Sequence, residues 1–217
     1  MTNTSFKGHM DLFPTPIAKY RYSDPEFLRK LILEIIEKIP KEEIFTGTGN
    51  ITHYYNNGNF MENTIELNDF MEWTKSCISN YAEQFLGMIG LEFVDLNVWL
   101  NSTDGGVQPG HIHNNSLISA TYYVQLDPEK HVGLEVYNPR TIVPRNPIID
   151  VNAEIETPFN AKSVKLEVAQ GDLLVWPSEL LHGLAQPKVD VPRISLSMNF
   201  MPTIVKSHLY GFKVSKL

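Results

Sequence analysis

Apolar residues recur at helical spacing in two segments of the N-terminal part of the chain. In the first, SDPEFLRKLILEIIEKIP, Ser23 or Asp24 can cap a helix and Pro40 ends it. The second covers 67–88, and glycines follow it. Its predicted buried face consists of Phe70, Trp73, Cys77, Ile78, Tyr81 and Phe85. The pattern therefore predicts two amphipathic helices.

After Gly90 the helical period gives way to short apolar runs rich in β-branched and aromatic residues. Runs separated by glycine and proline turns predict strands. These are 92–101, 117–126, 133–137, 162–168, 173–176 and 193–200. Two helices followed by such strands predict an α+β fold whose C-terminal part is a sandwich or jelly roll. We expect one domain over 1–217, with an extended segment and helices in 1–90 packing on a core in 91–203, and a tail in 204–217.

Composition and charge narrow the possible classes of protein. Of the 217 residues, 42% are hydrophobic and 20% are charged, which excludes a disordered or collagen-like chain. The net charge of −7 argues against non-specific binding to nucleic acid. Cys77 is the single cysteine, so the chain forms no internal disulfide and no multi-thiolate metal site. Since the sequence contains neither a secretory signal nor an apolar run of membrane length, we expect a soluble cytoplasmic protein.

Histidines are the first candidates for chemistry. Four of the seven have positions typical of surface or packing residues: His9, His53, His131 and His208. His111 and His113 form an H-x-H motif in PGHIHNNS. In an extended segment, side chains two residues apart point to the same side, so both imidazoles can bind one metal ion. The alternative is a polar surface strand that carries two histidines by chance.

A second group of candidates lies in GDLLVWPSELLHGLAQPKVDVPRISLSMNF. His182 follows an apolar strand, and Arg193 begins the next one. If both side chains face the interior between sheets, a buried guanidinium there needs an anionic partner, either a protein carboxylate or a bound one. The alternative is that Arg193 pairs with Asp190 or Glu179 on the rim.

The order of these motifs resembles a known superfamily. H-x-H, then SLISATYYVQLDP, GLEVYNPR, GDLLVWPSELLHGL and PRISLSMNF, is similar to the non-haem Fe(II)/2-oxoglutarate-dependent oxygenases. The similarity is greatest to a bacterial and phage branch that has H-x-H where most relatives have H-x-D, and it includes the opening LFPTPI and both helices. The resemblance implies a double-stranded β-helix, a jelly roll with Fe(II) at its open end.

The resemblance also implies a set of metal ligands. His111 matches the first histidine ligand and His182 the distal one, while His113 occupies the position of the usual carboxylate. The departure leaves three possibilities. His113 binds the metal directly, it stands beside a water ligand, or an acid such as Asp104 or Glu135 supplies the missing oxygen.

The same resemblance assigns the co-substrate site. Arg193 matches the arginine that binds the distal carboxylate of 2-oxoglutarate, for which its planar fork is suited. Tyr123 matches a phenol that holds the same carboxylate, and Asn101 is placed to reach the co-substrate, whereas Tyr122 is expected to be a packing residue. The candidate walls of the substrate cleft are Trp99, Arg140, Trp176 and Asn199.

The implied reaction hydroxylates a substrate C–H bond and converts 2-oxoglutarate to succinate and CO2. The fold does not identify the substrate, which can be a peptidyl residue, a free amino acid or another small metabolite. Two other classes remain open. One is a cupin-like dioxygenase with three histidine ligands that does not use 2-oxoglutarate, and the other is a non-enzymatic jelly roll that binds a ligand or a protein.

Overall fold

The computed structural model describes most of the chain. Its described residues are 8, 11, 13–47, 49–54, 60, 64–139, 154–157 and 159–216. Within this part, no helix is both long enough and apolar enough to cross a membrane.

Both predicted helices are confirmed. Helix α1 covers Pro25–Lys38, and the Asp24 side chain caps it by accepting a hydrogen bond from the Phe27 amide at 3.0 Å. Helix α2 covers Asn68–Leu86 and ends at Gly87, whose φ of 67° is easily adopted by glycine. The predicted buried face of α2 is wrong at its C-terminal end, because Phe85 is 53% exposed.

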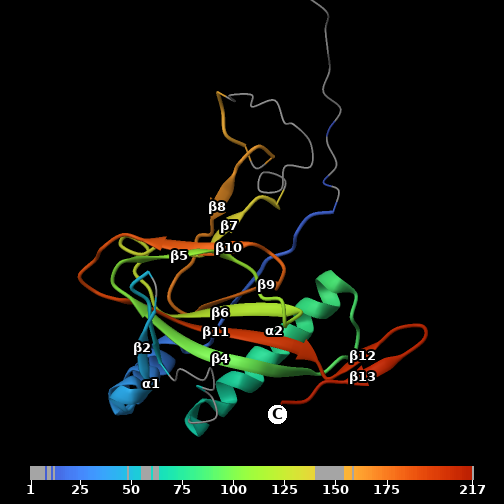
Figure 1. Cartoon of the computed structure of the whole chain (residues 1–217), viewed down its shortest axis with the longest axis horizontal. Helices are drawn as coiled ribbons and strands as arrows, with labels where there is room; N and C mark the ends of the chain where they lie inside the picture. The colour runs from blue at the N-terminus through green and yellow to red at the C-terminus, as the bar shows by residue number, and fades with distance from the viewer. Residues whose placement is uncertain are drawn as a thin grey trace, which may run out of the picture.

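The strands form two main antiparallel sheets and a separate two-stranded hairpin (Figure 1). The larger sheet has the order β1-β9-β6-β11-β4-β3-β2. Its strands are β1 (Ala18–Arg21), β2 (Ile44–Thr46), β3 (Thr52–Tyr54), β4 (Phe93–Thr103), β6 (Ile118–Gln125), β9 (Asp172–Pro177) and β11 (Arg193–Pro202). The smaller sheet has the order β5-β10-β7-β8, formed by β5 (Gly106–His111), β7 (Glu135–Tyr137), β8 (Ser163–Lys165) and β10 (His182–Gln186).

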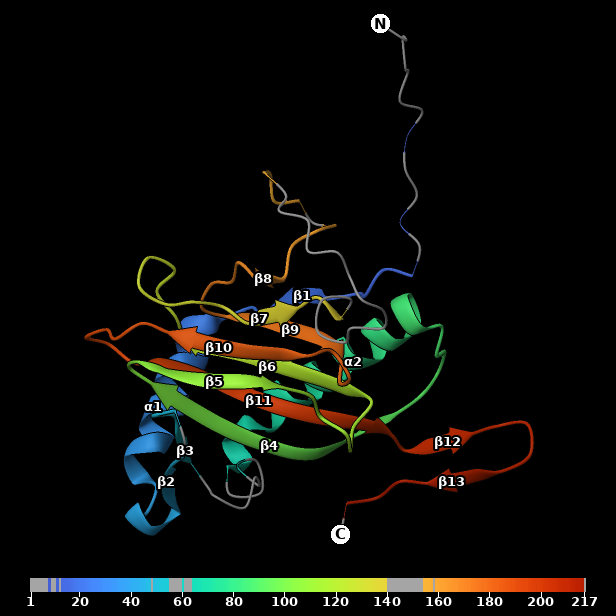
Figure 2. The ribbon, with the colours of Figure 1, turned by 45° about the horizontal axis from the view of Figure 1, so that its top comes forward.

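All six predicted strands form, although the runs 133–137 and 162–168 shorten to β7 and β8. Strands β1, β2, β3, β5 and β10 lie outside the six predicted runs. The expected tail instead contains a separate hairpin of β12 (Ile204–Lys206) and β13 (Gly211–Lys213), which projects from the body in both views (Figures 1 and 2).

The two faces of the larger sheet have different partners. Helices α1 and α2 cover one face, where Ile32 and Phe70 belong to the same buried cluster as Tyr122. Tyr122 is fully buried there, as expected for a packing residue. The next residue, Tyr123, points to the opposite face and packs with Leu134 and Trp176. This alternation places the smaller sheet on the opposite side from the helices (Figure 2).

A glycine contact holds the start of β5 in place. The Val107 amide donates to the Gly49 carbonyl at 3.1 Å, and a Cβ on Gly106 would lie 1.8 Å from the same oxygen. Gly49 itself has a φ of 82°. These two glycines therefore allow the turn before β3 to reach β5.

Candidate functional site

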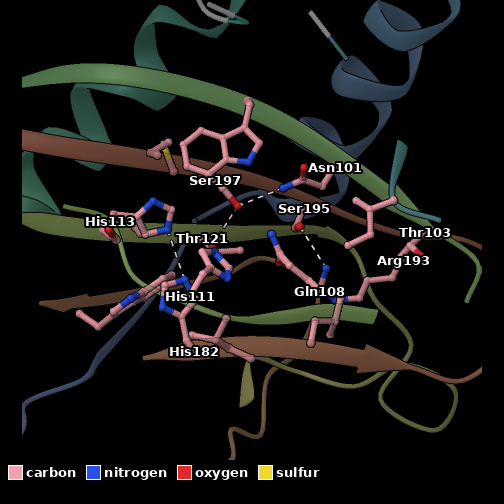
Figure 3. A pocket seen from close by; sticks show the side chains of 18 residues that line it. Asn101, Thr103, Gln108, His111, His113, Thr121, His182, Arg193, Ser195 and Ser197 are labelled. Carbon is pink, nitrogen blue, oxygen red and sulfur yellow. Dashed lines mark hydrogen bonds between the residues drawn. The ribbon is translucent and has the colours of Figure 1, made fainter. Parts of the chain in front are cut away.

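Three histidines meet between the two sheets. His111 ends β5 and His182 begins β10, and the two residues are direct partners in the smaller sheet. His113 lies just beyond the end of β5. The potential ligand nitrogens of the three rings all lie within 4.8 Å of one another, and the Nε2 atoms of His113 and His182 are 3.3 Å apart (Figure 3). The structure therefore brings the three predicted ligands together.

The Nδ1 atom of each ring has a neighbour outside the cluster. His111 Nδ1 is 3.0 Å from the Pro109 carbonyl, and His182 Nδ1 is 2.7 Å from the Leu180 carbonyl. His113 Nδ1 is 3.3 Å from the Asn199 side-chain amide. Contacts to backbone carbonyls, as at His111 and His182, orient histidine ligands and leave the other nitrogen for a metal.

Burial keeps two of these imidazoles neutral. It lowers the pKa of both His113 and His182 to about 4, and the neighbouring His111 acts in the same direction. For His182, the hydrogen bond to the Leu180 carbonyl opposes this shift. Neutral imidazole is the form that binds a metal, so the cluster fits a divalent transition ion.

No carboxylate joins this cluster within the described residues. Asp104 forms an ion pair with Lys188. Glu135 accepts a hydrogen bond from the Ser163 hydroxyl at 2.6 Å. The proposal that either acid replaces the usual carboxylate is therefore not supported.

Arg193 is buried in the same region without an acidic partner among the described residues. Its side chain is held by neutral groups, because Nε donates to the Val132 carbonyl and Nη1 to the Ser195 hydroxyl, both at 3.1 Å. The guanidinium carbon lies 5.0 Å from the centre of the Tyr123 ring. Arg193 is only 4% exposed, and burial lowers its pKa. A buried guanidinium that contacts only neutral groups is stabilised when an anion binds beside it.

The alternative pairing of Arg193 at the rim is wrong. Asp190 instead forms an ion pair with Lys130 at 3.1 Å. Glu179 forms no ion pair with Arg193. The guanidinium thus remains available to a ligand.

One cavity contains both the histidine cluster and Arg193. Figure 3 shows the histidines at one end and Arg193 at the other. Other polar residues that line the cavity include Asn101, Thr103, Gln108, Thr121, Ser195 and Ser197. No acidic residue is among the described residues that line the cavity. The arrangement suits an anionic ligand that reaches from the cluster to the guanidinium.

The remaining predicted site residues have different positions. Asn101 lines the cavity, where its amide donates to the Ser197 hydroxyl at 3.2 Å. Tyr123 is fully buried beside Arg193, and its hydroxyl accepts a hydrogen bond from the Leu134 amide. Trp99 and Trp176 line the cavity and contact His113 and His182, respectively. Asn199 contacts His113. Arg140 lies outside the described residues.

Comparison with known proteins supports the resemblance to the Fe(II)/2-oxoglutarate-dependent oxygenases. Residues 97–199, which contain the cavity-lining strands and all three histidines, match a family model described as "Putative 2OG-Fe(II) oxygenase". None of the curated proteins matches the chain by sequence.

Solved structures share the fold. A prolyl-4-hydroxylase from Pseudomonas putida is 15% identical, with a TM-score of 0.53 over 86% of this chain and 92% of that one. The epimerase SnoN of nogalamycin biosynthesis, in complex with Fe3+, alpha-ketoglutarate and nogalamycin RO, is 11% identical, with a TM-score of 0.58 over 87% and 80%. HygX from Streptomyces hygroscopicus, with nickel, 2-oxoglutarate and hygromycin B, is 12% identical, with a TM-score of 0.56 over 87% and 84%.

The resemblance to the Fe(II)/2-oxoglutarate-dependent oxygenase superfamily is confirmed. Iron and 2-oxoglutarate, the cofactor and co-substrate expected from the sequence, are the ones that the family description names.

Sequence reasoning missed several polar residues that line this cavity. Thr103, Ser195 and Ser197 lie on β4 and β11, whose other positions are mainly apolar. Polar residues at every second position of a buried strand indicate a shared polar face. This signal was present in RISLSMN, where Arg193, Ser195, Ser197 and Asn199 alternate with apolar residues.

The lowered pKa values predict how the stability of the metal-free protein depends on pH. Between about pH 6.5 and pH 4, unfolded histidines bind protons that folded His113 and His182 do not, so the free energy of unfolding falls as the pH falls. Urea denaturation of wild type and His182→Gln across this range isolates the contribution of His182. Over this pH range, we expect the free energy of unfolding of the wild type to fall by about 1–3 kcal/mol more than that of His182→Gln, since one pKa unit corresponds to about 1.4 kcal/mol. Equal losses would contradict the assignment of a neutral His182.

Proposed function

We propose that this protein is a non-haem Fe(II)- and 2-oxoglutarate-dependent oxygenase that hydroxylates a C–H bond. The observation that carries the proposal is a buried guanidinium without an acidic partner in the same cavity as three converging histidines. One end of the cavity fits a metal and the other fits a carboxylate. 2-Oxoglutarate requires both, because its keto acid end binds a metal while its distal carboxylate remains free.

In this proposal His111, His113 and His182 hold the metal. Arg193 binds the distal carboxylate through its planar fork, and the Ser195 hydroxyl keeps the guanidinium in place. Tyr123 supports Arg193, because its ring packs against the guanidinium. Its hydroxyl accepts a hydrogen bond from the Leu134 amide. Asn101 is placed to contact the co-substrate from β4.

The two sheets then correspond to a double-stranded β-helix within a single domain over 1–217. Helices α1 and α2 cover the outer face of the larger sheet, and the cavity lies on its inner face. The sheets hold ligands from distant parts of the sequence on rigid strands. Trp99 and Trp176 supply apolar walls that exclude water from the cluster.

Bound Fe(II) would supply the activation of O2. In the overall reaction, the C1–C2 bond of 2-oxoglutarate breaks to release CO2, one oxygen atom of O2 enters succinate, and the other enters the substrate as a hydroxyl group. The co-substrate and the C–H bond each give up two electrons, which together reduce O2. The protein's own residues bind and orient the reactants.

The substrate is either a small molecule or a peptidyl residue. SnoN and HygX have structures with nogalamycin RO and hygromycin B, whereas the Pseudomonas putida protein is named as a prolyl-4-hydroxylase. The three proteins have similar sequence identity to this chain, and their names include both substrate classes, so the comparison does not favour one class.

One observation favours a second candidate function. The histidine cluster contains three imidazoles and no carboxylate among the described residues. A cupin-like dioxygenase would use this donor set without 2-oxoglutarate, and Arg193 would then bind a carboxylate of the substrate itself.

Product formation separates the two functions. The protein is reconstituted with Fe(II) without oxygen, 2-oxoglutarate is added, and succinate is measured after exposure to O2, with and without a library of amino acids, peptides and small metabolites. We expect succinate above the level of the His182→Ala variant, which lacks a ligand. Metal-loaded wild type that neither binds 2-oxoglutarate nor forms succinate would contradict the first function and favour the second.

Arg193 should determine the affinity for 2-oxoglutarate but not for the metal. Arg193→Ala should weaken 2-oxoglutarate binding by about 2–5 kcal/mol, as expected when one partner of a buried charge pair is removed. Arg193→Lys should also weaken it, because one ammonium group cannot reproduce the bidentate contact. Binding is followed by absorption of the anaerobic Fe(II) protein during titration with 2-oxoglutarate.

The control for this prediction is Lys30→Ala. Lys30 is exposed on α1, so its loss changes the net charge equally and leaves the cavity intact. Wild-type affinity for 2-oxoglutarate in Arg193→Ala would show that Arg193 does not bind the co-substrate.

A further inference from the structure

Two of the three histidines have a fixed ring tautomer. The Nδ1 atoms of His111 and His182 face the carbonyl oxygens of Pro109 and Leu180, at 3.0 and 2.7 Å. A carbonyl oxygen only accepts hydrogen bonds, so the ring hydrogen lies on Nδ1. In the neutral form of such a ring, Nε2 carries the lone pair that can bind a metal.

His113 differs because its Nδ1 faces a side-chain amide. An asparagine amide can donate through Nδ2 or accept through Oδ1. In the structure, Nδ2 of Asn199 lies 3.3 Å from His113 Nδ1, while Oδ1 accepts a hydrogen bond from the Ser119 hydroxyl at 2.8 Å. This arrangement makes His113 Nδ1 an acceptor and places the ring hydrogen on Nε2. That hydrogen points to Nε2 of His182, only 3.3 Å away.

The opposite arrangement is the one that a metal requires. If His113 Nε2 binds a metal, the ring hydrogen moves to Nδ1 and needs an acceptor, so the Asn199 amide must present Oδ1 instead of Nδ2. Its Nδ2 then faces Ser119. The side chain therefore has two orientations of nearly the same shape, and each is specific for one tautomer of His113.

A row of serine hydroxyl groups next to Asn199 can adjust its hydrogen bonds when the amide reverses. Ser119 Oγ lies 2.8 Å from Ser178 Oγ, which is also 2.8 Å from Ser116 Oγ. Ser119 and Ser178 are almost completely buried, as is Asn199. A hydroxyl group can donate or accept after rotation about one bond, so the direction of the row can reverse without movement of heavy atoms. The row thus supports either orientation of the amide.

We propose that Asn199 is a positioning residue that sets the tautomer of His113 and thereby determines whether His113 is available as a metal ligand. The proposal rests on the metal site of the proposed function and assigns Asn199 a role beyond that of a cleft wall. Asp at this position would only accept hydrogen bonds, so it would fix the hydrogen of His113 on Nδ1. It would also place a negative charge beside a cluster that has no carboxylate among the residues the structure describes.

The affinity for Ni(II) tests the proposal, because two variants of Asn199 should change it in opposite directions. Asn199→Ala should bind Ni(II) about 10–100-fold more weakly than wild type, as is typical when a residue behind a ligand is lost. Asn199→Asp, which has nearly the same shape, should bind more tightly than wild type. Because the added charge alone would also tighten binding, a residue that only fills space is recognised by an unchanged His113 tautomer in Asn199→Asp and by wild-type affinity in Asn199→Ala.

Ser197→Ala is the matched control. Ser197 lies on the same strand and lines the same cavity, but its hydrogen bonds go to Asn101 and Thr121, not to a histidine. Its Ni(II) affinity should equal that of wild type. Ser119→Ala keeps Asn199 and removes the hydroxyl that holds it, so it should weaken binding less than Asn199→Ala does. If Asn199→Asp does not fold, the Ni(II) affinity of Ser119→Ala tests the proposal in its place.

A direct readout is the tautomer itself. Nitrogen NMR of 15N-histidine-labelled, metal-free wild type should show the hydrogen of His113 on Nε2 and that of His182 on Nδ1, whereas Asn199→Asp should shift the His113 hydrogen to Nδ1. An unchanged His113 tautomer in Asn199→Asp, together with wild-type Ni(II) affinity in Asn199→Ala, would overturn the proposal. Failure of 2-oxoglutarate to bind, with these effects present, would contradict only the proposed function.

Discussion

A buried guanidinium without an acidic partner is the constraint on which the site depends. Arg193 is held by a carbonyl, a hydroxyl and the face of Tyr123, and these neutral groups position its charge without neutralising it. Leaving such a charge unpaired costs several kcal/mol in a dry interior. Because the described cavity lining contains no acid, an anionic ligand is the group that can remove this cost. The unpaired charge of Arg193 therefore supports the anion site of the proposed function.

The histidine cluster complements this anion site. Three imidazoles can lie within 4.8 Å of one another only if most of them are neutral, and burial supports this state for His113 and His182. A divalent ion bound by neutral ligands keeps its full charge, whereas the usual carboxylate ligand would cancel part of it. Together with Arg193, such an ion would make the whole cavity positive. A dianion that bridges the two ends would then be strongly favoured.

The sequence predicted much of this site because its signals are local. The helices have caps and a clear period, and the four longer strands of the larger sheet, β4, β6, β9 and β11, are mainly apolar runs. H-x-H, His182 and Arg193 stand out as polar residues beside those runs. Strands β5 and β10 were missed because GVQPGH and HGLAQ are short and contain glycine, so only their pairing with each other identifies them. The role of Asn199 also depends on contacts between residues distant in sequence, including Ser119 and His113.

The central claim is that one cavity binds a metal and 2-oxoglutarate together. It is tested most directly by calorimetric titration of 2-oxoglutarate into the protein without metal and with saturating Ni(II). The account predicts one molecule bound per chain and an affinity raised by the metal about 5–150-fold, the usual range of coupling between two sites. Equal affinity in the two titrations, or no binding to the metal-loaded protein, would contradict it.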